Sequence, residues 1–151
     1  MIFDDLRDLY QEVILDHGRR PRHGSRLAAF DATAQGDNPM CGDRVQVFVR
    51  HDATGRIAEA GFEARGCAIS IASADLMAET VAGRTDGEAR ALAAQFRDMA
   101  RTGDATDGDA AIERLRPLAG VHEFPSRVKC ATLPWHALLA ALDDKGGASS
   151  E

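Results

Sequence analysis

The sequence predicts an α+β domain in which a small antiparallel sheet of three strands is covered by helices. Segments with alternating apolar residues gather in the first half of the chain, and segments with apolar residues at helical spacing fill the second half. Strands grouped before helices are typical of this class. With 151 residues and no internal repeat, we expect a single domain over residues 1–144, followed by a flexible tail over residues 145–151.

The first half of the chain predicts one helix and three strands. Apolar residues at helical spacing indicate the opening helix: Phe3, Leu6, Leu9, Tyr10, Val13 and Ile14. This pattern stops before Gly18 and Pro21, which are typical of a helix end. After a basic loop, HGRRPRHGS, strand character covers residues 28–35, 45–51 and 57–64. DATG at residues 52–55 predicts a hairpin turn between the second and third strands.

The second half of the chain predicts four helices. They are expected over residues 69–81, 86–102, 110–115 and 129–142. Gly83 closes the first of them. In the last, apolar residues stand at i, i+3, i+4 and i+7: Trp135, Leu138, Leu139 and Leu142. The closing KGGASSE is expected to fray.

Composition excludes several classes of function. The formal charge is -6 and the isoelectric point is near 5.3, which argues against binding to nucleic acid or to an anionic membrane surface. No apolar run approaches the ~20 residues that cross a bilayer, and MIFDDLRD lacks the features of a signal peptide. We therefore expect a cytoplasmic protein whose partners are proteins or small ions.

Three cysteines occupy the expected ends of structural elements. Cys41 lies in NPMCGD before the second strand, Cys67 at the first turn of the helix after the third strand, and Cys130 at the start of the last helix. Their spacing suits neither a disulfide framework nor a CxxC motif. A helix N-terminus favours thiolate over thiol, so these positions are typical of reactive or ligating sulfur.

Two interpretations of the cysteines are open at this stage. Three thiolates together with the carboxylate of Asp43 would supply four donors, the number that a tetrahedral zinc ion takes. Free cysteines are also among the most buried residue types and often only fill a core. Position alone does not decide between zinc binding and core packing.

Four stretches of the chain together resemble one family. ILDHGRRPRH, GDNPMCGD, GFEARGCAISIASADLM and SRVKCATLPW combine three cysteine environments with an aspartate, and they are similar to the SufU branch of the IscU-like iron–sulfur cluster assembly proteins. The match covers most of the chain, and the region from Arg84 to Leu118 is the least diagnostic. In the scaffold branch a histidine precedes the third cysteine, and a chaperone reads an LPPVK segment. This chain has Lys129 and FPSRVK there, and its long insertion before Cys130 is also SufU-like.

The resemblance implies a zinc-dependent sulfurtransferase. Its zinc ligands would be Cys41, Asp43, Cys67 and Cys130, and Cys41 would accept persulfide sulfur from a pyridoxal-phosphate cysteine desulfurase of the SufS type. In the family, a histidine of the desulfurase displaces the first cysteine from zinc. Arg127, three residues before Cys130, would lie near the exchanged sulfur, and downstream iron–sulfur assembly proteins would receive it. Two alternatives remain: an iron–sulfur cluster scaffold, and a zinc-stapled interaction domain without sulfur chemistry.

Overall fold

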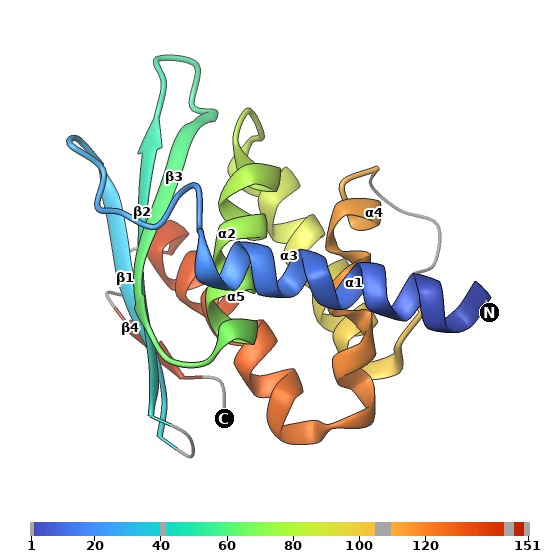
Figure 1. Ribbon diagram of the computed structural model, residues 1–151. Coiled ribbons are helices and arrows are strands. Elements are labelled where there is room, and N and C mark those ends of the chain that lie inside the picture. The colour runs from blue at the N-terminus through green and yellow to red at the C-terminus, as the bar shows by residue number, and fades with distance from the viewer. Residues whose placement is uncertain (1, 40–41, 105–109, 144–146, 150–151) are drawn as a thin grey trace.

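The computed structural model describes residues 2–39, 42–104, 110–143 and 147–149, without the side chains of residues 2–10 and 147–149. Figure 1 shows one sheet with the helices packed against one of its faces. The strands are β1 (Ala32–Asn38), β2 (Asp43–His51), β3 (Ile57–Arg65) and β4 (Gly147–Ser149), in the spatial order β3-β2-β1-β4. β1, β2 and β3 are antiparallel neighbours, so the predicted α+β class with three antiparallel strands is confirmed.

β1 begins and ends later than the sequence predicts. It covers residues 32–38 instead of 28–35, and its last residue, Asn38, pairs with Asp43 at the start of β2. Residues 36–38 (Gly, Asp and Asn) are poor strand formers, so their own preferences gave no sign of this pairing. The consequence is that the cysteine-bearing segment NPMCGD connects two paired strands at the end of a hairpin.

β4 corrects the expected frayed tail. Gly147–Ser149 runs parallel to β1, with Gln35 opposite Gly147 and Asp37 opposite Ser149. Small residues such as these carry little strand preference of their own, but they can pair with the edge that β1 otherwise leaves open. The prediction of a flexible segment over residues 145–151 therefore fails over residues 147–149.

The first three helices match their predicted positions closely. They are α1 (Ile2–Arg19), α2 (Ala68–Val81) and α3 (Asp86–Thr102). Cys67 is the N-cap residue of α2, as its position after the third strand predicts. α3 begins with a capping box, in which the hydroxyl of Thr85 accepts from the backbone N–H of Glu88 and the Glu88 carboxylate accepts from the N–H of Thr85.

The last helix starts a full turn earlier than predicted. α4 (Ile112–Leu115) leads into a 3-10 helix, η1 (Arg116–Glu123), and α5 then runs over Pro125–Leu142. Pro125 occupies the first helical turn, where a missing N–H costs nothing. Cys130 therefore lies in the second turn of α5 and not at its N-terminus, so the dipole argument made for its thiol does not apply.

Asp75 ties the basic loop after α1 to the middle of α2. Its side chain is fully buried; one carboxylate oxygen lies 2.5 Å from Nδ1 of His17, and the other accepts from the backbone N–H of His23 at 2.8 Å. Two hydrogen bonds to a buried carboxylate offset much of the cost of removing it from water. The HGRRPRH loop is therefore held against α2 at both ends.

The core lies between the sheet and the helices. Val45, Val47 and Phe62 from the sheet are packed there with side chains of α2, α3 and α5, and all three are buried. Figure 1 shows α5 crossing behind the sheet and α1 lying along the front of α2. Among the described helices, none has both the length and the apolar character required for a membrane span.

His51 joins three parts of the fold and gives a pH-dependent prediction. Its Nδ1 and Nε2 atoms each lie 2.6 Å from a carboxylate, of Asp31 before β1 and of Asp86 at the start of α3. Burial by itself lowers the pKa of His51, but the hydrogen bonds to Asp86 and Asp31 outweigh it and raise the pKa above its ordinary value. A raised pKa stabilises the fold fully below the unfolded value, about pH 6.5, and the effect is lost as the pH rises through the folded value.

We expect His51→Gln to lower the free energy of unfolding more at about pH 6 than at about pH 9, by a difference on the order of 1 kcal/mol. The modest size follows because the carboxylates of Asp31 and Asp86 are 55% and 40% exposed. Urea unfolding of both proteins at several pH values measures this difference. A cost of the substitution that stays constant, or grows with pH, would contradict the prediction.

Candidate metal centre

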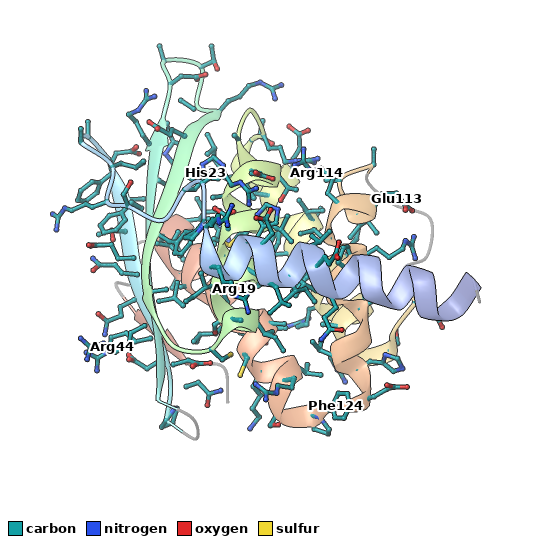
Figure 2. All side chains as sticks on the ribbon, viewed as in Figure 1. Arg19, His23, Arg44, Glu113, Arg114 and Phe124 are labelled. Carbon is teal, nitrogen blue, oxygen red and sulfur yellow. The ribbon has the colours of Figure 1, made fainter. Side chains whose placement is uncertain are left out.

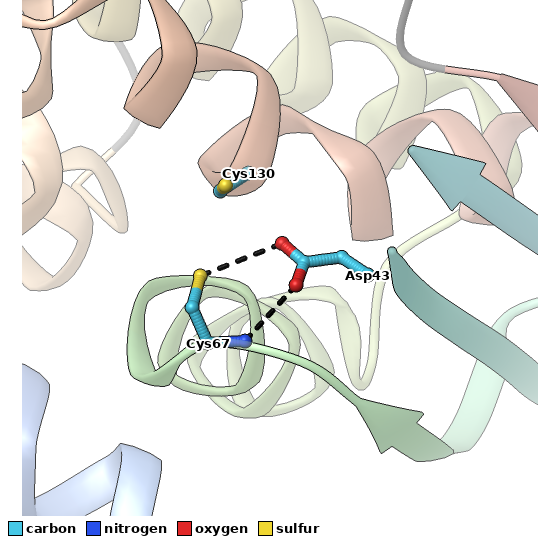
Figure 3. Close-up of side chains that lie close together, drawn as sticks. All are labelled: Asp43, Cys67 and Cys130. Atoms are coloured by element: carbon cyan, nitrogen blue, oxygen red, sulfur yellow. Dashed lines mark hydrogen bonds between the residues drawn. The ribbon is translucent and has the colours of Figure 1, made fainter. Parts of the chain in front are cut away.

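Asp43, Cys67 and Cys130 converge from three elements at one end of the sheet (Figure 3). Asp43 is the first residue of β2, Cys67 caps α2, and Cys130 lies in α5. One ligand atom from each lies within 4.8 Å of the others. Asp43 and Cys130 are each only 3% exposed, whereas Cys67 is half-buried.

The carboxylate of Asp43 is held by α2. The backbone N–H of Cys67 donates to Oδ1 at 3.0 Å, and the hydroxyl of Ser70 donates to Oδ2 at 3.1 Å. The Ser70 hydroxyl also lies 3.0 Å from the carbonyl oxygen of Cys130, so it links α2 to α5 directly beneath the group. These contacts fix the orientation of the carboxylate toward the two sulfur atoms.

The three side chains bring three ionisable acidic groups together. Burial raises the pKa of the Cys130 thiol well above its ordinary value, and the adjacent Asp43 carboxylate and Cys67 thiol raise it further. Three acidic groups this close together in a buried place cannot all be ionised without a compensating cation. A divalent ion would reverse the balance, because it favours the thiolate and carboxylate forms.

The geometry fits zinc. Ligand atoms bound to one tetrahedral zinc ion lie roughly 3.3–3.8 Å apart, given bonds of about 2.3 Å to sulfur and 2.0–2.2 Å to oxygen. Sγ of Cys67 already lies 3.4 Å from Oδ2 of Asp43. Two sulfur donors and one oxygen donor suit a borderline-soft ion, and all three ligand atoms lie within 4.8 Å of one another.

The structure does not test the predicted roles of the other two site residues, Cys41 and Arg127. Cys41 lies outside the described residues, so its part in the site stays a prediction. Arg127 is exposed in the first turn of α5 and lines an apolar cavity of about 570 Å³. Ala68 and Ile69, which directly follow Cys67, line the same cavity. The predicted role of Arg127 near the exchanged sulfur also stays a prediction.

A second group of possible ligands, which the sequence analysis did not single out, consists of His17, Asp75 and Glu79. Nδ1 of His17 and Oδ2 of Asp75 lie only 2.5 Å apart, closer than the roughly 3.3 Å between two ligands of one tetrahedral ion. This distance is that of a hydrogen bond, and Glu79 is engaged by Arg114 at 2.5 Å. We therefore assign this group to holding the loop after α1.

Gly66 gives a prediction about the Asp43 carboxylate. Its φ is +155°, and a Cβ atom added there would lie only 2.7 Å from Cγ of Asp43. We expect Gly66→Ala to displace the carboxylate and to weaken zinc binding by roughly tenfold or more. Competition with a chromophoric chelator measures the affinity.

Gly55→Ala is the matched control, because Gly55 also has a positive φ (+85°) but its added Cβ would meet nothing within 4 Å. Both variants carry the strain of a positive φ, whereas only Gly66→Ala crowds Asp43. Equal zinc affinity in the two variants would show that the close approach of Gly66 to Asp43 is unimportant for binding.

The fold and this group define a class: small α+β domains with two cysteines and an aspartate gathered at one end of the sheet. The family model described as the NifU-like N terminal domain matches residues 9–144. The chain therefore belongs to this family. Its matched relatives include proteins named IscU and SufU. The resemblance drawn from the sequence motifs is confirmed.

Relatives with two different names match almost the whole chain. The iron–sulfur cluster assembly scaffold protein IscU of Streptococcus pyogenes is 38% identical over 94% of this chain and 87% of its own length. The zinc-dependent sulfurtransferase SufU of Bacillus subtilis is also 38% identical, over 97% of this chain and 95% of its own. A crystal structure from Fervidobacterium islandicum AW-1, assigned as an iron–sulfur cluster assembly scaffold for the SUF system, superposes with a TM-score of 0.79 at 31% identity and covers 87% of this chain and 94% of its own.

Proposed function

We propose that this protein is a zinc-dependent sulfur acceptor that takes persulfide sulfur from a pyridoxal-phosphate cysteine desulfurase and passes it to iron–sulfur cluster assembly. The observation that carries the proposal is the convergence of Asp43, Cys67 and Cys130. Asp43 pairs with Asn38, and the sequence places Cys41 between these two residues. A relative named as a zinc-dependent sulfurtransferase, which this chain matches over nearly its full length, supports the same choice.

In this proposal four side chains hold the ion. Asp43, Cys67 and Cys130 supply three donors, and Cys41 supplies the fourth. Cys41 is two residues from Asp43, so covalent geometry keeps their Cα atoms within about 7 Å of each other. Bound zinc would keep the thiols deprotonated at neutral pH, although burial of the Cys130 thiol raises its pKa.

Cys41 is assigned the transfer because it is the one cysteine of the three that the sequence places in a hairpin connection. Its thiolate would attack the outer sulfur of the desulfurase persulfide, forming a new S–S bond. The S–S bond on the desulfurase breaks, and its cysteine leaves as a thiolate that takes up a proton. Gly42 has φ +77°, so the residue after Cys41 adopts a backbone conformation that favours glycine.

Arg127 would serve the same reaction as a fixed positive charge. Its guanidinium cannot lose its proton at neutral pH, and it is exposed on the side of α5 that faces the residues after Cys67. A cation at this place would stabilise the negative charge of a persulfide on an incoming cysteine. The desulfurase would be of the SufS type, and the reaction would take place in the cytoplasm.

The second candidate is a cluster scaffold, which the name of the Streptococcus relative favours. Two thiols and a carboxylate could also hold iron. Lys129 argues against a scaffold function. The scaffold branch has a histidine at this position, whereas a protonated lysine has no lone pair with which to bind metal. Lys129 instead lines a cavity with Arg97 and Arg101.

Purification without oxygen, followed by a desulfurase assay, tests the proposal. We expect about one zinc per chain and no stoichiometric acid-labile sulfide, because the donors at the site match zinc. Alanine release by a matched cysteine desulfurase should rise when the zinc-loaded protein is added, because sulfur acceptance frees the enzyme for another cycle. Iron and sulfide in stoichiometric amounts, without any effect on turnover, would instead establish the scaffold.

A further inference from the structure

A basic cavity lies between α3, η1 and α5, apart from the metal centre. Its volume is about 600 Å³. It is lined by Arg97, Arg101, His122, Pro125, Val128, Lys129, Thr132 and His136. None of these is a carboxylate, and Asp43, Cys67 and Cys130 do not line it. Three cations and two imidazoles therefore converge in one hollow of a chain whose formal charge is -6.

Among the described residues, the three cations of this cavity have no ion-pair partner. In the part of the chain that the structure describes, no carboxylate oxygen lies within 4.0 Å of the side-chain nitrogens of Arg97, Arg101 or Lys129. Two arginines nearby are paired: Arg90, also on α3, lies 2.6 Å from Asp143, and Arg114 of α4 lies 2.5 Å from Glu79. Like charges that are brought together without counterions repel one another, and a bound anion relieves that repulsion.

Two histidines line the cavity beside the cations. Nδ1 of His122 lies 2.9 Å from the carbonyl oxygen of Ala119, so the neutral tautomer that donates there leaves Nε2 as an acceptor. Burial lowers the pKa of His136, and the charge of Arg97 lowers it further.

An apolar annex continues the cavity. A second hollow of about 190 Å³ shares Arg97, Thr132 and His136 with it. Its remaining walls are Ala93, Ala94, Trp135, Leu139 and Arg90, whose guanidinium is paired with Asp143. Trp135 is stacked on Phe96. A basic mouth with an adjoining apolar hollow is suited to a small molecule that has a charged end and an uncharged end.

We propose that this cavity binds a small molecule that carries clustered oxyanions, either phosphates or carboxylates. Arginine presents planar N–H donors that suit both groups, and three cations on two helices match a ligand with several negative charges better than a single monovalent anion. The volume of the cavity lies within the range of ordinary ligand sites, about 300–1,000 Å³. The proposal is independent of the sulfur-transfer proposal.

Trp135 provides the readout, because it is the only tryptophan in the chain and lines the annex. The zinc-loaded protein is titrated with pyrophosphate and, separately, with citrate at constant ionic strength, and both fluorescence and calorimetry are recorded. We expect saturable binding of at least one of them. Binding of pyrophosphate alone would identify phosphate as the favoured group, and binding of citrate alone would identify carboxylate.

Arg97→Gln/Arg101→Gln should weaken this binding by roughly tenfold or more, because charge-assisted hydrogen bonds are lost. Arg101→Gln alone should show a smaller loss of anion affinity. This single variant replaces the double variant in the test if the double variant folds poorly. Arg50→Gln/Arg65→Gln, on β2 and β3, removes the same charge elsewhere and should bind as the unmodified protein does. The proposal is overturned if neither anion binds saturably, or if the control variant weakens binding as much as the cavity variant.

Discussion

Cys130→Ala is expected to lose most of the bound zinc and to unfold at a markedly lower temperature than the unmodified protein. Structural zinc sites in small peptides contribute roughly 10–16 kcal/mol of apparent binding, against about 5–15 kcal/mol for the whole stability of a domain. Cys130 is 3% exposed and links α5 to the group at β2 and α2, so no solvent molecule can simply replace it without rearrangement. Cys67→Ala should behave in the same way.

Zinc content and thermal melts of the purified variants measure this effect, and excess chelator supplies the control. If the lost stability comes from zinc, chelator should lower the melting temperature of the unmodified protein almost to that of Cys130→Ala. It should change the variant little. A variant that keeps stoichiometric zinc and the original melting temperature would remove Cys130 from the ligand set.

Cys41→Ala is expected to abolish the activation of the desulfurase while it keeps much of the zinc. In the proposed mechanism Cys41 carries the sulfur, whereas Asp43, Cys67 and Cys130 are positioned by a strand and two helices and hold the ion without it. The melting temperature should therefore fall much less than in Cys130→Ala. This separates the movement of sulfur from the binding of metal.

Desulfurase turnover, zinc content and melting temperature should be measured side by side for Cys41→Ala, Cys67→Ala and Cys130→Ala. Cys41→Ala serves as the matched comparison, because all three variants remove one thiol. Full activation of the desulfurase by Cys41→Ala would show that another cysteine accepts the sulfur, and the assignment of Cys41 would be wrong.

Local sequence signals were sufficient to predict an element where the conformational preferences of its own residues set its ends. The start of α2 at Ala68, with Cys67 as its cap, follows from the change of pattern after the third strand. α3 was predicted to its observed ends, residues 86–102, and Thr85 with Glu88 supplies the matching capping box. The motifs around the cysteines likewise indicated the group formed by Asp43, Cys67 and Cys130.

The missed features depend on long-range contacts. The last residues of β1 and all of β4 are strands only because they pair with a neighbour, which their small and polar residues do not reveal. The early start of α5 was missed because the apolar spacing that indicated this helix covers only Trp135 to Leu142, whereas the helix begins at Pro125, in a turn where proline is favoured.

The need of Asp75 for hydrogen-bond partners could have been inferred from the sequence. It stands alone as a charged residue in the otherwise apolar and small-residue stretch AISIASADLMA, where a buried carboxylate must have partners. Which partners these are could not be predicted, because His17 and His23 lie more than 50 residues earlier in the chain. The sequence thus indicates the need for a contact and the fold supplies it.

Mapping of the transferred sulfur tests the central claim most directly. The zinc-loaded protein is incubated with a matched cysteine desulfurase and cysteine without oxygen, its free thiols and persulfides are alkylated, and its peptides are analysed by mass spectrometry. We predict one additional sulfur atom on the peptide that contains Cys41, and none on the peptides that contain Cys67 or Cys130. Additional sulfur on one of those two peptides, or on no peptide while the desulfurase turns over, would contradict the account.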